Sequence, residues 1–440
     1  MDSKEHTLRV LMFPWLAHGH ISPYLELAKK LSKRNLYIYL CSTPINLSSV
    51  EKHLDEKMFP SIQLVELHLP SLPNLPPHYH TTKSLPPHLM STLMEAFDMA
   101  EPSFSDLLRV LKPDLLVYDY IQPWAPIAAS HQNIPAVQFL TNSASFISYS
   151  LHMITNQNEH YPFPSVVLHE HEYRQLVKMF NKERDLSSCS NIILIKTFLE
   201  IEAKYMGYLA LLSGNELVPV GPLVQEPTVD DDESGLNILK WLNEKDQSSV
   251  VFVSFGTEYF MSKEEIQEIA YGLELSKLNF IWVIRFPEGE NVGVEEVLPQ
   301  GFFERVKERG MVLKDWASQA KILTHSSVGR FVSHCGWSSV MEGLYNGVPV
   351  IAMPMHIDQP INARLVVELG AGIEIEKQDE KFVREELAKV VNEVVIEKKG
   401  EVIRKKAKEL SEMMRRKGEE EINVVVEKFV QICSKSKNQV

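Results

Sequence analysis

Short apolar runs alternate with helical patterns along most of this 440-residue chain, and this alternation constrains the fold more than any other feature. Runs that are apolar at nearly every position predict strands buried on both faces, as in parallel sheets covered by helices. The sequence therefore predicts an α/β protein built from two sets of βα units. The expected strands are 8–13, 36–43, 114–119, 248–256, 279–285, 328–336 and 348–354.

A polar segment separates the two sets of strands. It combines prolines, a glycine and the acidic run Asp230–Glu233, a composition typical of linkers. We expect an N-terminal domain at 1–225, a linker at 226–245, a C-terminal domain at 246–420 and a final helix at 421–440. Ligands of open α/β sheets bind at the carboxyl ends of the strands, so the expected site is a cleft between the two halves.

Charge and cysteine content exclude several classes of protein. The chain has 45 Lys plus Arg against 58 Asp plus Glu, a net charge of −13, which argues against a nucleic-acid partner. Its four cysteines are far apart and form no CxxC pair, so neither a disulfide framework nor a structural zinc site is expected. The N-terminus has no apolar core typical of a signal peptide, and no apolar run is long enough to span a membrane. We expect a cytoplasmic enzyme.

Two residues at strand ends in the first half are candidates for acid–base chemistry. His20 follows the first strand in the sequence WLAHGHISP, and Asp119 ends the strand at 114–119. Imidazole is the usual base near neutral pH, and a carboxylate can orient it and stabilise its protonated form. A structural turn histidine and an aspartate that only ends a strand are the alternatives. A metal site at His18 and His20 lacks a third ligand at recognisable spacing, and we expect no metal.

Two strand-end turns in the second half are candidates for anion binding. In SHCGWSSVMEGL, residues 333–344, a strand leads through a glycine-containing turn into a helix, whose N-terminus attracts anions. His334 and Ser339 would add donors, although a plain capped helix is an alternative. The turn from Ser254 through Gly256 to Thr257 suits close approach of a phosphate or sugar to the backbone.

Other patterns carry no clear chemistry. The chain contains neither GxGxxG nor GxxxxGK[ST], and HEHEY at 169–173 is not the HExxH zinc motif. The acidic run at 230–233 resembles the motif of metal-dependent sugar transferases, but we interpret it as solvated linker. The basic cluster Arg404, Lys405, Lys406 and Lys408 is interpreted as the solvated face of a C-terminal helix.

The stretch from Trp316 to Gln359 resembles the 44-residue signature box of plant UDP-sugar-dependent glycosyltransferases of family one. Matches include WAxQ at the start, HCGW in the middle, then a glutamate, GVP and the final DQ. Outside the box, HGHxxP, DxxxPWA around Asp119, VGPL and QPxNARL extend the resemblance over nearly the whole chain. It implies the GT-B fold, in which two Rossmann-like domains face a central cleft and the last helix packs back on the N-terminal domain.

The resemblance also implies a UDP-sugar site in the second half, with separate groups for the uracil, the ribose, the diphosphate and the sugar. The commonest box reads HCGWNS, and Ser338 stands here in place of the asparagine. The implied residues are Trp316 for uracil, Gln319 and Glu342 for ribose, His334, Ser339 and the backbone around Trp337–Ser338 for the diphosphate, Asp358 and Gln359 for the sugar, and Ser254, Gly256, Thr257, Ala317 and Gly336 as further contacts.

The implied reaction is an inverting transfer, with His20 as general base and Asp119 as its partner. The final Gln359 favours UDP-glucose as co-substrate, and no cofactor or metal is expected. The SSVME version of the box, CSTPINLSS at 41–49 and SFGTEYF at 254–260 resemble a subgroup that adds a sugar to a sugar already on a small molecule. The expected acceptor is a triterpenoid or flavonoid glycoside, and the expected state is a monomer.

Three alternative functions are compatible with the sequence. A glucosyltransferase acting on an aglycone differs only in its acceptor. A UDP-sugar hydrolase or epimerase of the same fold would consume the donor without an acceptor. A non-catalytic binder would keep the box without a base, and the presence of both His20 and Asp119 argues against it.

Overall fold

A computed structural model describes ten segments of the chain, which divide into two compact units. The first unit comprises Met1–Gln157, Asn181–Leu223 and Lys417–Val440, and the second comprises Asn158–Phe180 and Val224–Arg416. The described residues are 7–55, 57–83, 85–156, 159–179, 191–227, 233–257, 259–286, 292–314, 317–396 and 398–437.

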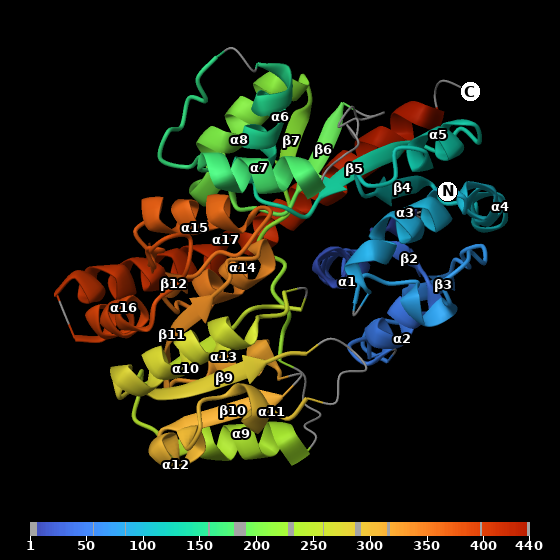
Figure 1. Cartoon of the computed structure of the whole chain (residues 1–440). Helices are drawn as coiled ribbons and strands as arrows, with labels where there is room; N and C mark the ends of the chain where they lie inside the picture. Colours follow the sequence, from blue (N-terminus) through green and yellow to red (C-terminus); the bar gives the residue numbers. More distant parts are fainter. Residues whose placement is uncertain are drawn as a thin grey trace. The chain divides into compact units, whose positions relative to one another are not determined.

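The first unit is built on a seven-stranded sheet in the order β3-β2-β1-β4-β5-β6-β7, and every neighbouring pair is parallel (Figure 1). Its strands are β1 Arg9–Phe13, β2 Tyr37–Ser42, β3 Ile62–Glu66, β4 Leu115–Tyr118, β5 Ala136–Leu140, β6 Ile192–Ile195 and β7 Glu216–Pro219. Its helices are α1 His18–Ser32, α2 Pro44–Glu51, α3 Met90–Asp98, α4 Glu101–Leu111, α5 Ala125–Ser130, α6 Ala144–Thr155, α8 Leu199–Ser213 and two short 3₁₀ helices, Pro77–Tyr79 and Pro87–Leu89.

The second unit carries a six-stranded sheet, β10-β9-β8-β11-β12-β13, which is again parallel throughout. Its strands are β8 Val250–Ser254, β9 Asn279–Ile284, β10 Gly310–Lys314, β11 Val328–Ser333, β12 Val350–Ala352 and β13 Gly372–Glu374. Its helices are α7 Glu170–Met179, α9 Glu233–Asn243, α10 Lys263–Ser276, α11 Val294–Val297, α12 Phe302–Val306, α13 Gln319–Thr324, α14 Trp337–Tyr345, α15 Gln359–Glu368 and α16 Arg384–Ile396.

The central strands are buried on both faces, which explains why they are apolar at successive positions. In β1, Val10 and Met12 belong to one core cluster, whereas Leu11 and Phe13 belong to another. The strand β8 of the second unit divides in the same way between two clusters. A strand with only one buried face would alternate apolar and polar residues instead. The α/β architecture expected from the sequence is therefore confirmed.

The strand order reverses direction at one point in each sheet. In the first unit the chain runs outward from β1 to β3 and then returns to place β4 on the other side of β1. In the second unit β8 and β11 have the same relation. Helices on opposite faces leave a crevice at the carboxyl ends of such a strand pair, and ligands bind there. The turns after β1, β4, β8 and β11 are therefore the places where site residues are expected.

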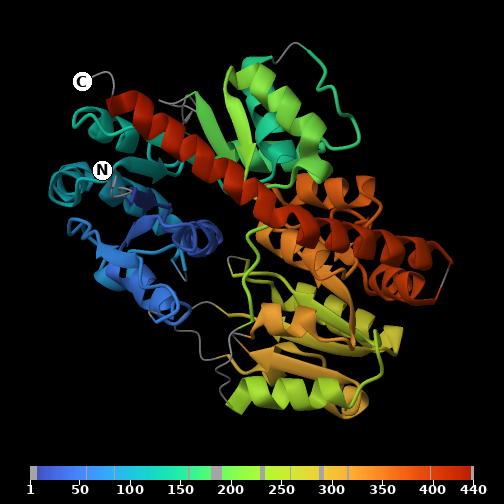
Figure 2. The same ribbon diagram turned by 180° about the vertical axis from the view of Figure 1, so that it is seen from behind.

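The chain ends in α17, a helix of 40 residues from Lys398 to Lys437, drawn in red in Figure 2. Residues up to Arg416 belong to the second unit and those from Lys417 to the first. Within the first unit, Val425 and Phe429 lie in the core cluster that contains Val10. The apolar residues of the C-terminal part recur every three or four positions, so they form one helical stripe that covers this face of the sheet.

The segment predicted as a linker contains a helix. Residues 228–232 lie outside the described residues, but α9 begins at Glu233, and its Ile238 and Leu242 pack in the core cluster of Phe252. These two residues are four positions apart and thus share one helix face. The domain boundaries proposed from composition remain a prediction. Among the described residues, the search for a helix long and apolar enough to cross a bilayer finds none.

Candidate active site

His20 lies in the first turn of α1, directly after the loop that follows β1. The helix begins at His18, and Pro23 is inside it. The backbone N–H groups of His20 and Ile21 both donate to the carbonyl oxygen of Ala17, each at 2.9 Å. These bonds fix the first turn, and the imidazole remains 16% exposed. The histidine therefore has a rigid backbone and an accessible ring.

Asp119 directly follows β4, the strand that pairs with β1 through Phe13 and Tyr118. Its side chain is fully buried, and its Oδ2 atom lies 2.6 Å from Nδ1 of His20. Its Oδ1 atom accepts the backbone N–H of Ile121 at 3.2 Å. An ionised carboxylate can only accept, so the pairing places the ring proton on Nδ1 and leaves the basic lone pair on Nε2. The predicted pair is brought together with the geometry that base catalysis requires.

Thr141 is a third member of this group that the sequence analysis missed. It follows β5, the strand next to β4, and its hydroxyl lies 3.1 Å from Nδ1 of His20. The Thr141 hydroxyl thus lies within hydrogen-bond distance of the same ring nitrogen that contacts Asp119. The sequence signal was present, because a polar TNS segment ends an apolar strand at the same sheet edge.

In the second unit, the turn after β11 has the features of an anion site. Gly336 is the N-cap of α14 and has no side chain to bond the first-turn N–H groups. Cys335 adopts a left-handed backbone conformation with φ of +65°, which is uncommon for a residue with a Cβ atom. Its N–H donates to the hydroxyl of Ser333 at 3.1 Å. The surrounding structure therefore holds this turn in a constrained shape ahead of the helix N-terminus.

His334 occupies this turn as a buried, neutral imidazole. Burial, and to a smaller extent the neighbouring His356, lowers the pKa of His334 to about 4. Two glycines make room for the ring: a Cβ atom would lie 2.5 Å from its Nε2 at Gly256 and 2.6 Å at Gly336. Gly256 also has φ of +75°, which favours glycine. At neutral pH the residue is a hydrogen-bond donor without a full positive charge.

The predicted ribose ligands form a hydrogen-bonded group between α13 and α14. The side-chain amide nitrogen of Gln319 donates to Ser339 Oγ at 3.1 Å and to Glu342 Oε2 at 2.8 Å. Ser339 and Glu342 are three residues apart and share one face of α14. The structure thus brings together a residue predicted for the diphosphate and two predicted for the ribose.

The predicted sugar-binding residues are at the start of α15. The side-chain oxygen of Gln359 accepts the backbone N–H groups of Met355 and His356, at 2.9 and 3.1 Å, which leaves its amide group oriented as a donor. The Asp358 carboxylate accepts from the side chain of Asn362 at 3.0 Å. Both predicted residues are almost fully buried.

Asn362, which the sequence analysis did not single out, links these residues to the anion turn. Its fully buried side chain donates to Asp358 and also to the backbone oxygen of Cys335, both at 3.0 Å. Its spacing of four residues from Asp358 on one helix was the available sequence signal. This amide holds α15 and the turn after β11 in a fixed relation.

The remaining predicted donor residues are placed as follows. Ser254 ends β8 and pairs with Ser333 of β11, so it lies beside the anion turn, and Thr257 follows Gly256. Trp337 and Ser338 are the first two residues of α14. Ala317 lies just before α13, and Trp316 falls outside the described residues.

Among the residues that the structure describes, no group of three or more His, Cys, Asp or Glu side chains is arranged to hold a metal ion. His18, beside His20, is an exposed residue at the start of α1.

Two family models cover the chain almost end to end. A glycosyltransferase N-terminal domain matches residues 6–225, and the UDP-glucoronosyl and UDP-glucosyl transferase family matches residues 216–423. UDP-glucosyltransferase 29 of Panax ginseng is 51% identical over 100% of both chains.

Two further relatives are each 47% identical. One is the beta-D-glucosyl crocetin beta-1,6-glucosyltransferase of Gardenia jasminoides, with 97% of this chain and 99% of the relative aligned. The other is the flavanone 7-O-glucoside 2''-O-beta-L-rhamnosyltransferase of Citrus maxima, with 99% and 100% aligned.

Solved structures share the fold. UGT73P12 of Glycyrrhiza uralensis, complexed with glycyrrhetinic acid 3-O-monoglucuronide, superposes with a TM-score of 0.86 at 24% identity, covering 99% of this chain and 98% of the other. These matches agree with the two parallel sheets of the structure. They also agree with the motif residues at the carboxyl edges of these sheets. The chain belongs to the plant family-one UDP-glycosyltransferases, enzymes of the GT-B fold that use a UDP-sugar donor.

Proposed function

We propose that this enzyme transfers glucose from UDP-glucose to a sugar hydroxyl of a plant small-molecule glycoside, with His20 as the general base. The observation that carries the proposal is the 2.6 Å contact between His20 Nδ1 and a fully buried Asp119. A carboxylate in that position stabilises the imidazolium that forms when the ring accepts a proton.

In the proposed step the acceptor hydroxyl gives its proton to Nε2 of His20. The acceptor oxygen forms a bond to the anomeric carbon of the donor sugar, and the bond from that carbon to the phosphate oxygen breaks. The electron pair of the broken bond leaves with UDP, and the product has the opposite anomeric configuration. General-base catalysis of this kind contributes about 10²- to 10⁴-fold in rate.

We propose that the turn after β11 receives the departing diphosphate. The neutral His334 and the N-terminus of α14 supply donors that stabilise the developing charge. Ser338 takes the place of the usual asparagine with a shorter donor. Gln319 and Glu342 serve the ribose, and Trp316, which the resemblance assigns to the uracil, serves the base.

The glycoside acceptor is supported by the names of two relatives, which act on a glucosyl crocetin and on a flavanone glucoside. The proposed acceptor is a triterpenoid or flavonoid glycoside, and the flavanone glucoside of the Citrus maxima relative supports the flavonoid class. The glucose donor is supported by the two relatives named as glucosyltransferases and by Gln359 at the end of the box. The Citrus maxima relative transfers rhamnose, so the donor must be tested together with the acceptor.

The test is UDP release by the full-length enzyme with UDP-glucose or UDP-rhamnose. Each donor is offered to matched pairs of a terpenoid or flavonoid glycoside and its aglycone, with an assay without acceptor as control. We expect release with UDP-glucose and the glycosides only, and a product heavier by one hexose in mass spectrometry. NMR of the product then gives the linkage.

The other outcomes distinguish the rival functions. Release with aglycones alone would replace the glycoside acceptor with an aglycone and leave the base mechanism intact. Release of UDP without any acceptor would indicate a hydrolase, and conversion of UDP-glucose into another UDP-sugar without release would indicate an epimerase. Binding of UDP-glucose with no release under any condition would indicate a non-catalytic binder.

A further inference from the structure

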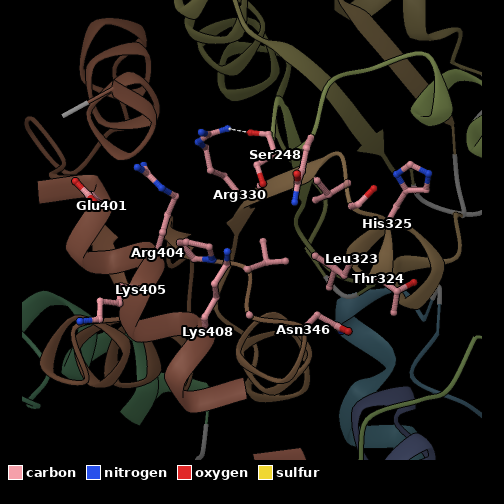
Figure 3. Close-up of a pocket in the computed structure, with 17 residues that line it drawn as sticks. Ser248, Leu323, Thr324, His325, Arg330, Asn346, Glu401, Arg404, Lys405 and Lys408 are labelled. Atoms are coloured by element: carbon pink, nitrogen blue, oxygen red, sulfur yellow. Dashed lines mark hydrogen bonds between the residues drawn. The ribbon is translucent and has the colours of Figure 1, made fainter. Parts of the chain in front are cut away.

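The basic residues at the start of α17 line a cavity of about 680 Å³ in the second unit (Figure 3). The cavity opens at the amino ends of β8, β11 and β12, where Ser248, Val328 and Pro349 line it. The turn with His334 follows the carboxyl end of β11, so the cavity and the donor-binding residues are at opposite edges of one sheet. A cavity of this size is typical of small-molecule sites.

The cavity lining is strongly cationic. Arg330 lines it from β11, and Arg404, Lys405 and Lys408 line it from α17. The Lys405 side chain is largely exposed, and its Nζ lies 4.0 Å from Glu409. Glu401 is the carboxylate among the residues that line the cavity. His325 also lines it, but burial lowers the pKa of this imidazole, so it is neutral at neutral pH. The lining therefore has an excess of three positive charges in a chain with a net charge of −13.

Arg330 is a buried charge whose hydrogen-bonding capacity is only partly used. Its side chain is 3% exposed, and its Nη1 donates to the backbone oxygen of Ser248 at 2.9 Å. Its buried Nε has no hydrogen-bond partner among the described residues. Burial and the neighbouring Arg404 lower the pKa of Arg330 to about 10, so the group is still protonated at neutral pH. A buried charge repelled by a like charge is costly unless an anion compensates it.

The backbone is shaped locally to place this arginine. The pairing of β11 with β8 shifts register between Val328 and Arg330, which is a bulge at Gly329. A Cβ atom at Gly329 would lie 2.6 Å from the backbone oxygen of Ser248, so only glycine fits. In an unbroken strand, residues three positions apart point to opposite faces of the sheet. Because of the bulge, Val328 and Phe331 belong to the same core cluster. Bulges commonly re-aim a side chain toward a site.

We propose that this cavity, called here the Arg330 pocket, binds the phosphate group of a small molecule at a second site distinct from the donor site. The buried guanidinium supplies the oriented donor, and Arg404 and Lys408 supply charge at the entrance. An oxyanion there accepts hydrogen bonds from the guanidinium group of Arg330 and relieves its repulsion with Arg404. Guanidinium groups bind phosphate oxygens with directed hydrogen bonds, whereas lysine acts as a point charge.

The test is isothermal titration of the full-length enzyme with sodium pyrophosphate in the presence of saturating UDP, with sodium chloride at equal ionic strength as the reference. UDP occupies the donor site, so any remaining pyrophosphate binding is elsewhere. We expect one pyrophosphate per chain. Complete loss of pyrophosphate binding when UDP is present would overturn the proposal.

Three variants locate the binding. Arg330→Met keeps the volume and removes the charge, and we expect affinity to fall about 10- to 100-fold, as for a lost charge-assisted hydrogen bond. Lys408→Gln, at an exposed position, should weaken binding about threefold to tenfold. The matched control is Lys406→Gln, which neutralises a lysine of the same helix that does not line the pocket and lies 3.9 Å from Glu409.

The outcomes distinguish a specific phosphate site in the Arg330 pocket from weak attraction of anions by the solvated basic face of α17. Equal weakening by Lys406→Gln and Lys408→Gln would mean that the helix attracts anions only through its overall charge, and the proposal would fail. If Arg330→Met does not fold, the comparison of the two lysine variants still decides. Where it folds, we expect its Tm without anion to equal or exceed that of the unaltered enzyme, because an uncompensated buried charge is gone.

Discussion

The two units have sheets with the same strand order at their centres, yet the residues after the central strands differ in chemical character. In the first unit the turns after β1 and β4 carry the accessible imidazole of His20 and the buried carboxylate of Asp119, which are hydrogen-bonded to each other. In the second unit the turns after β8 and β11 carry a buried, neutral His334 between two glycines. We propose that the first arrangement moves a proton and that the second accommodates an anion. The topology decides where a site forms, and the side chains at the strand ends decide its chemistry.

The largest expected effect separates proton transfer from donor binding. His20→Ala removes the proposed base, so transfer should fall about 10²- to 10⁴-fold. The affinity for UDP should stay within about twofold, because no donor residue of the second unit is altered. Turnover assays and titration with UDP check this. Loss of UDP binding in a folded variant would contradict the division of roles between the two units.

The carboxylate behind the base should have the next largest effect. Asp119→Asn keeps the shape of the side chain but removes the charge that stabilises the imidazolium and fixes the ring tautomer, so turnover should fall roughly 10²-fold. The KM for UDP-glucose should change little. Steady-state kinetics over a series of donor concentrations provides the measurement, and turnover equal to that of the unaltered enzyme would remove Asp119 from the mechanism.

A pair of glycine substitutions compares the two units directly. Gly256→Ala introduces a Cβ atom 2.5 Å from His334 at a left-handed position, so UDP affinity should fall about tenfold or more. Gly19→Ala, next to His20, meets nothing within 4 Å, and alanine suits a helix better than glycine. It should change turnover by less than about twofold. Similar UDP affinities in both variants would show that the packing around His334 does not matter.

The neutral His334 should also make the fold sensitive to acid. Its pKa of about 4 lies below the ordinary histidine value of 6.5, so the unfolded chain binds a proton between these values and the folded chain does not. This contribution to stability is complete above about pH 6.5 and is lost as the pH falls toward 4.

Replacing the histidine should therefore reduce the acid sensitivity. Between pH 7 and pH 5 the free energy of unfolding should fall by about 2 kcal/mol less in His334→Gln than in the unaltered enzyme. Urea unfolding at the two pH values measures the difference. His131→Gln, at an exposed position, is the control. The same loss in the His334 variant and the unaltered enzyme would contradict the assignment of a buried neutral ring.

Much of the candidate site could be predicted because parallel sheets collect their strand ends at one edge. His20 and Asp119 are 99 residues apart, but each follows an apolar strand, and their contact follows once β1 and β4 are neighbours. The residues that were missed act through partners distant in sequence. Thr141 contacts a residue 121 positions away, and Asn362 bonds Cys335 27 positions earlier. A polar residue with an ordinary local context does not reveal such a partner.

The sequence by itself determined the α/β class, the βα order and the identity of the residues at the strand ends, because burial on both faces and strand-end turns leave local patterns. Only the tertiary structure decided which strand ends are neighbours and which histidine is buried and neutral. It also placed Arg330 and three basic residues of α17 around one cavity, where a basic cluster had suggested only a solvated helix face. Burial and pairing depend on distances between elements remote in the chain, and these distances are set by packing rather than by local sequence.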